Sequence, residues 1–248
     1  MRAAAILWLR QLKRYARARA RVVGSLGQPL IFLFALGFGF GPIFARAGHG
    51  NYLDFVVPGV ISMGIIFTSV YGGIEIIFDR QFGFLKETLV APVPRFVIVL
   101  GRTLGGATTA LLQGLVILVV SLIAGFRIHH PLAALLALPF MALIAVLFSA
   151  IGTAIGSVLE DIQGFPLIMN FLVLPIFFFS NALFPSRGLP APLKLVVRIN
   201  PLSDGVTGIR DAFAGHASLS MVSGLAVLGA LATLLLAIAS HLFSRIEL

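Results

Sequence analysis

The 248-residue chain is 59% hydrophobic and only 11% charged, with a mean hydropathy of +1.05, which excludes a soluble globular domain because too few charged side chains are present to cover its surface. It contains no cysteine, which excludes disulfides, thiolate metal sites and a cysteine nucleophile. The net charge of +9 is better explained by anchoring beside anionic lipid than by nucleic-acid binding.

The first 21 residues carry basic side chains and no acid, with apolar residues between the charges. Trp8, the only tryptophan, suits a membrane interface. We therefore expect an amphipathic interface helix that lies along the inner membrane surface. Its basic residues are Arg2, Arg10, Lys13, Arg14, Arg17, Arg19 and Arg21.

An apolar run over residues 22–44 follows, long enough for a helix to cross the roughly 30 Å hydrocarbon core. A signal peptide is the alternative, because Ala45-Arg46-Ala47 resembles a cleavage site. The apolar region of a signal peptide is only about 7–15 residues long, so the run favours a retained membrane span.

Five further apolar runs follow, and none alternates with the period of a membrane-spanning β-strand. They predict helices over residues 55–78, 96–125, 132–159, 165–184 and 219–243. We therefore expect an all-α polytopic membrane protein, with one transmembrane domain over 1–248 and six spans. Glycine pairs at 37/41, 101/105 and 152/156 have the spacing that allows close helix approach, although 26 glycines make it common by chance.

The polar connection before the last span has its own helical pattern. Lys194 and Arg198 are four residues apart and share one face of a short helix after Pro190 and Pro192. Asn200 then provides a stop and a new N-cap. We expect two short helices that dip into the outer leaflet without crossing it.

The distribution of Lys and Arg predicts the orientation in the membrane. With the N-terminus inside, the inner segments hold seven basic residues before Val22, three over 80–95, and Arg245. The short outer loops 45–54 and 126–131 hold one each. This bias places both termini in the cytoplasm, although the long outer connection is basic and departs from the rule.

Sequence motifs for covalent chemistry are absent. None of the three lysines follows a glycine, so the chain has no P-loop for ATP, and neither HExxH nor GxSxG occurs. The pair His129-His130 lies in a short loop without acids and is better explained as a solvated turn than as a metal site. We expect no enzyme active site and no bound cofactor.

Two ionisable residues fall inside predicted spans, where such residues are functional candidates. Glu75 lies near the inner end of the second span, and Arg102 lies about two turns into the third. They could form an ion pair that braces this helical hairpin, or each could extend separately to the inner headgroups. The middles of the spans carry no acid or base, which argues against ion-coupled transport.

Two segments resemble motifs of ABC-2-type transporter permeases. The first begins with Val57-Pro58-Gly59, continues from Asp79 to Arg95, and ends at Gly101-Arg102. The second runs from Asn200-Pro201-Leu202 to Gly208-Ile209-Arg210. The length, the six spans and the basic N-terminal helix are also similar to this family, so the resemblance covers essentially the whole chain.

The resemblance implies a coupling helix between the second and third spans that docks on a separate ATPase subunit; a solvated loop is the alternative. Its residues are Asp79, Arg80, Phe82, Gly83, Phe84, Leu85, Lys86 and Glu87, of which Phe82, Phe84 and Leu85 would face the partner. The interface helix, with Arg10, Lys13, Arg14 and Arg17, would also contact the ATPase. Glu160-Asp161 could touch the same partner or could end a helix.

The implied function is that of a permease subunit in an ATP-driven exporter of the bacterial inner membrane. Two permease chains, identical or different, would form the pathway, and ATP and Mg²⁺ would bind to separate ATPase subunits. The cargo would be lipid-linked, a glycan, or drug-like and hydrophobic. The alternatives are a lipid-modifying membrane enzyme, for which no converging polar residues are found, and a non-transporting assembly protein, which would not need the mixed-charge segment 79–95.

Overall fold

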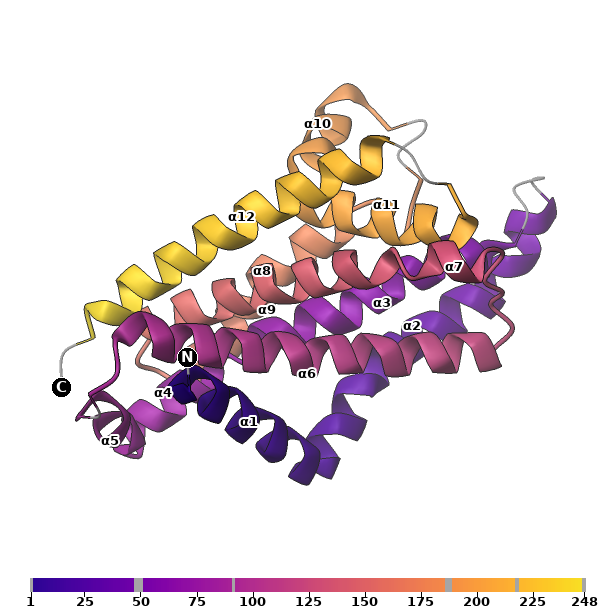
Figure 1. Ribbon diagram of the computed structural model, residues 1–248. Helices are drawn as coiled ribbons and strands as arrows, with labels where there is room; N and C mark the ends of the chain where they lie inside the picture. The colour runs from indigo at the N-terminus through magenta and orange to yellow at the C-terminus, as the bar shows by residue number, and fades with distance from the viewer. Residues whose placement is uncertain (1, 47–50, 91, 186–188, 217–218, 247–248) are drawn as a thin grey trace.

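The computed structural model describes residues 2–46, 51–90, 92–185, 189–216 and 219–246, and every regular element in these ranges is a helix (Figure 1). The all-α prediction is confirmed. The helices are α1 (Arg2–Arg17), α2 (Arg19–Arg46), α3 (Tyr52–Tyr71), α4 (Ile74–Gln81), α5 (Phe84–Val90), α6 (Arg95–Ile123), α7 (Pro131–Ala134), α8 (Ala137–Val158), α9 (Gly164–Phe178), α10 (Ala191–Ile199), α11 (Pro201–Ala214) and α12 (Leu219–Ser244).

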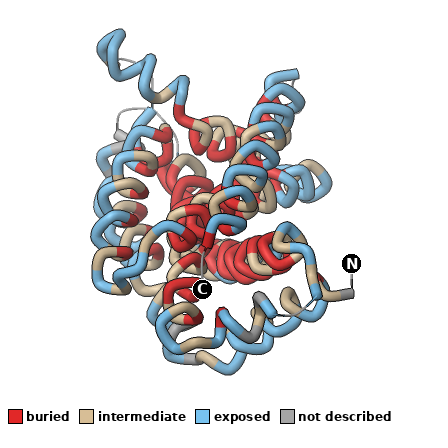
Figure 2. The backbone as a smooth tube through the Cα atoms, turned by 90° about the vertical axis from the view of Figure 1, so that its left-hand side faces the viewer, coloured by how far each residue is buried: buried red, intermediate tan, exposed pale blue. Residues whose placement is uncertain are grey.

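The long helices form an elongated bundle with α3 at its centre, packed against α2, α6, α8, α9 and α11. Viewed along the bundle, buried residues gather in the middle and exposed ones face outward (Figure 2). Helices α4 and α5 lie at one end, where α12 also finishes, and α7, α10 and α11 lie at the other. We call these the α5 end and the α11 end.

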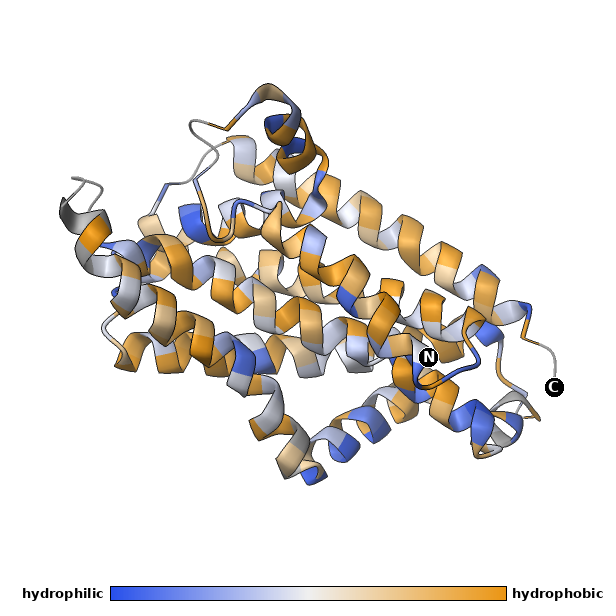
Figure 3. Cartoon of the chain, turned by 180° about the vertical axis from the view of Figure 1, so that it is seen from behind, coloured by the Kyte–Doolittle hydropathy of each residue, from blue (hydrophilic) through white to orange (hydrophobic). Residues whose placement is uncertain are grey.

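Apolar residues cover the long helices, whereas hydrophilic ones gather at the ends of the bundle and on α1 (Figure 3). Among the described residues, five helical segments are long and apolar enough to cross a membrane. They are Val22–Gly41, Tyr52–Gln81, Arg95–Ile123, Pro131–Val158 and Leu219–Ser244.

The remaining predicted span, 165–184, is only partly helical. Helix α9 has 15 residues, which rise about 22 Å and fall short of the hydrocarbon thickness. The chain turns after Phe179, and Asn181 has a left-handed φ of 58° that no continuing helix could include. Five to six helices can therefore span, and the fifth ends earlier than predicted.

The second predicted span is broken at Gly72-Gly73 into α3 and α4. A Cβ on Gly73 would contact the backbone of Gly152, and a Cβ on Gly156 would contact the backbone of Gly73. The Gly152-x-x-x-Gly156 pair on α8 therefore packs directly against the break at Gly72-Gly73. Only residues without side chains allow the two backbones to approach so closely.

The two short helices predicted before the last span are present as α10 and α11. Asn200 caps α11 as expected: its side-chain oxygen accepts from the backbone N–H of Leu202 at 3.0 Å, and its amide donates to the Ile176 carbonyl at 2.6 Å. Arg210 anchors α11 to the bundle by donating to the carbonyls of Phe55 and Asn181 at 3.1 and 3.0 Å. Its guanidinium also lies 4.2 Å from the centroid of the Phe55 ring.

Candidate coupling site

The corner between α4 and α5 is shaped by Gly83. Its φ of +79° is readily adopted only by glycine, and it turns the chain between Gln81, the end of α4, and Phe84, the start of α5. Pro92 and Pro94 follow α5, and α6 begins directly afterwards at Arg95. The predicted coupling segment is therefore a short helix between two turns at the α5 end (Figure 1).

This corner exposes two aromatic rings and buries one aliphatic side chain. Phe82 and Phe84 are 66% and 52% exposed, whereas Leu85 is 1% exposed. Leu85 packs in a small core with Ile76, Ile98 and Phe243, which come from α4, α6 and α12. The expectation that Leu85 faces a partner is corrected. The Leu85 side chain faces inward, because burying it in this apolar core holds α5 against the bundle. Lys86 is exposed, and the side chain of Glu87 lies outside the described residues.

Asp79 and Arg80, also predicted in the coupling segment, are turned toward the bundle. The Asp79 carboxylate is buried and accepts from the Arg102 guanidinium of α6 at 2.6 Å. Arg80 donates to the carbonyls of Ser157 and Leu159 at 2.7 and 3.3 Å, at the C-terminus of α8. These carbonyls have no partner within the helix, so a cation there is favourable.

The hypothesis of an ion pair between Glu75 and Arg102 is corrected by these contacts. Arg102 pairs with Asp79, and Glu75 instead accepts from the Gln11 amide of α1 at 2.6 Å and lies 3.5 Å from Arg14. Glu75 and Asp79 are four residues apart and share one face of α4. The register between α4 and α6 brings the second of them, rather than the first, to Arg102.

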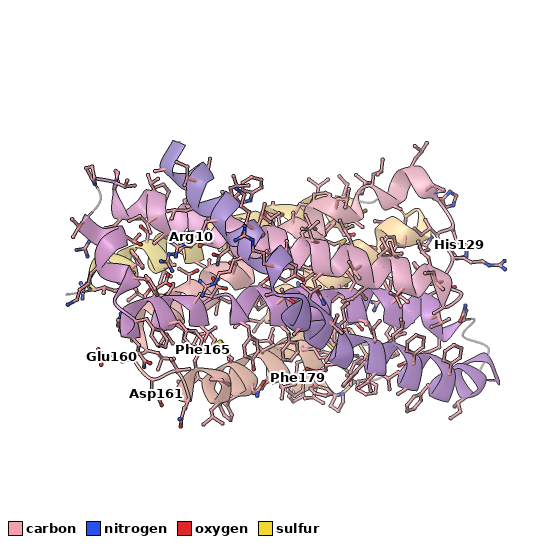
Figure 4. All side chains as sticks on the ribbon, turned by 90° about the horizontal axis from the view of Figure 1, so that it is seen from below. Arg10, His129, Glu160, Asp161, Phe165 and Phe179 are labelled. Atoms are coloured by element: carbon pink, nitrogen blue, oxygen red, sulfur yellow. The ribbon has the colours of Figure 1, made fainter. Side chains whose placement is uncertain are left out.

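Arg14 connects the two acids. Its guanidinium lies 3.5 Å from Glu75 and 3.9 Å from Asp79, so two cations and two carboxylates from α1, α4 and α6 meet in one cluster. We call Arg14, Glu75, Asp79 and Arg102 the charge cluster. The other predicted interface residues, Arg10, Lys13 and Arg17, are exposed; Figure 4 labels Arg10 on α1.

Helix α1 is seated on α6 over the glycine pair 101/105. A Cβ on Gly101 would lie 2.9 Å from the Ala4 carbonyl oxygen, and one on Gly105 would lie 2.6 Å from the Gln11 Cβ. Two hydrogen bonds fasten the same contact, from the Trp8 indole to Thr108 at 2.9 Å and from the Tyr15 hydroxyl to Gln113 at 2.6 Å. The basic helix therefore docks tightly on the third span.

Glu160 and Asp161 lie at the α5 end, opposite His129 (Figure 4). Glu160 is 3.8 Å from Arg80, and its backbone carbonyl accepts from Gln81 at 2.9 Å. The Asp161 carboxylate accepts from the backbone N–H groups of Gln163 and Gly164 at 2.8 and 3.0 Å, at the start of α9. Both residues thus stabilise the turn between α8 and α9.

Comparison with known proteins identifies the family. The sequence profile of the "ABC-2 type transporter" family matches residues 2–214. The chain belongs to the ABC-2 type transporter family. The permease is 30% identical to nodulation protein J of Rhizobium leguminosarum bv. trifolii over 213 residues, 85% of this chain and 80% of that protein. It is 29% identical to the inner membrane transport permease YadH of Escherichia coli K12 over 229 residues, 90% and 87% of the two chains.

Family membership establishes the coarse function. The permease is a multi-pass inner membrane protein and the membrane subunit of an ABC-2 transporter. Such subunits lack an ATPase site and work with an ATP-binding subunit. The corner at the α5 end, with the charge cluster behind it, combines two exposed aromatic rings with connections into the bundle.

Proposed function

We propose that this permease exports its cargo by coupling ATP hydrolysis, on a separate ABC ATPase, to movement of its helices through the α4–α5 corner. The observation that supports the proposal is that some side chains of that corner are exposed while others contact the long helices. Phe82 and Phe84 are exposed, while Leu85, Asp79 and Arg80 fasten the same segment to α6, α8 and α12. A force on the exposed rings would therefore reach three long helices.

The interface helix has a place in this proposal. Through Arg14 and Gln11, α1 is bonded to the same stretch of α4 that pairs with α6. The exposed residues Arg10, Lys13 and Arg17 would face anionic lipid and the ATPase. In this arrangement the α5 end and both termini are cytoplasmic, which agrees with the bias of Lys and Arg.

Two permease chains, identical or different, would form the pathway, with ATP and Mg²⁺ bound by two ATPase subunits. The exposed apolar face of α9, where Leu167 and Phe171 are 73% and 84% exposed, is available to lipid or to a second chain. The cargo is expected to be lipid-linked, a glycan, or drug-like and hydrophobic.

The proposal is tested by asking whether the tagged permease co-purifies with an ABC ATPase of its source organism. The double variant Phe82→Ser and Phe84→Ser should lose the ATPase and its stimulation while keeping the thermal stability of the wild type, because both rings are exposed. The matched control is the double variant Leu132→Ser on α7 and Leu135→Ser directly after it; these side chains are 86% and 59% exposed at the opposite end. If the Phe82/Phe84 variant retained association and stimulation, the docking role of the corner would be wrong.

A further inference from the structure

A cleft of about 490 Å³ opens between α10, α11 and α12 at the α11 end of the bundle (Figure 1). Its volume falls within the range of about 300–1,000 Å³ that is usual for sites of small organic ligands. Asp204, Thr207 and Asp211 share one face of α11 and line the cleft. Lys194 and Arg198 share one face of α10 and also line it. The cleft therefore has an acidic wall and a basic wall.

The two walls are fastened to each other where α10 meets α11. Asn200 ends α10 and caps α11, and the Ser203 hydroxyl donates to the Val197 carbonyl at 2.6 Å. Helix α12 bounds the third side, because a Cβ on Gly224 would lie 3.7 Å from the Cβ of Asp204. The cleft is therefore built by three helices, and α11 contacts both of the others.

The four charged residues of the cleft do not pair with one another. Among the described residues, none of the four has an opposite charge within 4.0 Å or a hydrogen bond through its side chain. Burial raises the pKa of the Asp204 and Asp211 carboxyls, because their charged forms have lost water. His216 and Arg210 offset this rise in the pKa of Asp211 only in part. A cation placed in the cleft would stabilise both carboxylates.

The pattern of charge indicates a ligand that carries both signs. An anion alone would pair with Lys194 and Arg198 but would leave the two carboxylates unpaired, and a cation alone would leave the reverse. A phosphate accepts charge-assisted hydrogen bonds from guanidinium and ammonium groups. A primary ammonium has three N–H donors for the carboxylates and for the Thr207 hydroxyl. A phosphoethanolamine group carries both parts at a short separation.

Helix α10 lies where such a group could belong to a lipid. None of its residues, all of which the structure describes, is buried, and Leu195 and Ile199 are 58% and 72% exposed. A short helix that combines exposed apolar and basic residues is typical of a membrane interface. With the α5 end in the cytoplasm, the cleft faces the outer leaflet.

We propose that the cleft between α10, α11 and α12 binds a phosphoethanolamine group, with its phosphate on Lys194 and Arg198 and its ammonium on Asp204 and Asp211. Binding would be independent of the ATPase and of the exported cargo. The group could come from phosphatidylethanolamine in the outer leaflet or from a soluble phosphoethanolamine ester. The two sources differ in whether acyl chains are needed for binding.

Binding is measured on the delipidated, full-length permease by native mass spectrometry. The probes are phosphatidylethanolamine, phosphatidylcholine and phosphatidylglycerol of identical acyl chains, and glycerophosphoethanolamine. We expect phosphatidylethanolamine to bind most tightly of the lipids, because the choline nitrogen has no N–H to donate and phosphatidylglycerol has no ammonium. Equally tight binding of glycerophosphoethanolamine would identify a soluble ester as the ligand, and binding of the lipid alone would identify the membrane as its source. Phosphatidylglycerol binding as tightly as phosphatidylethanolamine would overturn the site.

Two variants remove the partners of the phosphate and of the ammonium separately. Arg198→Gln should weaken binding of both phosphatidylethanolamine and phosphatidylglycerol about three- to tenfold, the loss typical of one hydrogen bond. Asp204→Asn should weaken phosphatidylethanolamine by a similar factor and leave phosphatidylglycerol unchanged or tighter, because only the ammonium loses a partner. Its thermal stability should match the wild type, since Asp204 has no ion pair to lose. Equal losses of both lipids in an Asp204→Asn protein of wild-type stability would contradict the assigned roles.

The matched controls are Arg127→Gln and Asp54→Asn, which remove one cation and one acid at the same end of the bundle but outside the cleft lining. Neither should change the binding of any lipid. The charges of the cleft could instead pair with each other if α10 closed on α11. In that case Arg198→Gln and Asp204→Asn would bind lipid like the wild type, and the proposed ligand would be wrong.

Discussion

Arg102 of α6 donates to Asp79 of α4 across 2.6 Å, and both side chains are nearly buried, with 10% and 7% of their surfaces exposed. Arg14 of α1 lies 3.9 Å from the same carboxylate on its other side. The pair thus joins the start of the coupling corner to the third span. Arg14 of α1 adds a second cation, so the two carboxylates of α4 face two cations.

Removing one member of this pair should be costly. Arg102→Met leaves a buried carboxylate with only Arg14 nearby, and the loss of stability should be about 3–5 kcal/mol. The double variant Arg102→Met with Asp79→Leu should lose less than the sum of the single variants, because no unpaired charge remains. Thermal unfolding of the purified permease measures this. Additive losses would show that the two charges do not stabilise each other.

The seat of α1 on α6 depends on the absence of a side chain at Gly105. Gly105→Leu would place a side chain where Gln11 now lies, so α1 should move away from α6. Trp8 reports this directly as the only tryptophan, because loss of its bond to Thr108 should shift its emission to longer wavelength. Gly229→Leu on α12 is the control, since a Cβ there meets nothing within 4 Å. An unchanged spectrum for Gly105→Leu would contradict the docking of α1.

Arg80 should contribute far more to the stability of the fold than Glu160, its ion-pair partner. Glu160 is 87% exposed, so its pair with Arg80 is worth at most about 1 kcal/mol and Glu160→Gln should have little effect. Arg80→Met removes two charge-assisted bonds to the end of α8, and should cost about 1.5–3 kcal/mol. Thermal stability compares the two variants. Equal losses of thermal stability in the two variants would show that Arg80 stabilises the fold through its ion pair with Glu160 rather than through its bonds to the end of α8.

Much of the fold could be predicted from the sequence, because hydrophobic length and turn residues determine it locally. The long apolar runs located five of the spans, and Asn200-Pro201 located the start of α11. The end of α9 was missed although Ser180 and Asn181 make residues 179–184 less apolar than the helix before them; the chain turns there because this segment packs between other elements. The buried Ser180, Ala182 and Leu183 show this packing.

The pairing within the charge cluster also could not be predicted from the sequence. Glu75 and Asp79 share a face of α4, and which of them meets Arg102 depends on how α4 is oriented after the break at Gly72-Gly73. That orientation is determined by backbone contact with Gly152 and Gly156 on a distant helix. The role of Arg14 depends in turn on the seat of α1 on α6. Both are tertiary relations that no local pattern encodes.

The orientation of the bundle can be tested with single cysteines, because the natural chain has none to interfere. Lys86→Cys on α5 and His129→Cys at the opposite end are both at exposed positions. With the α5 end in the cytoplasm, a membrane-impermeant maleimide added to intact cells should label His129→Cys only. Labelling of Lys86→Cys should appear once the cells are opened, which controls for its reactivity. Labelling of Lys86→Cys in intact cells would reverse the proposed orientation and with it the docking of an ATPase at the α4–α5 corner.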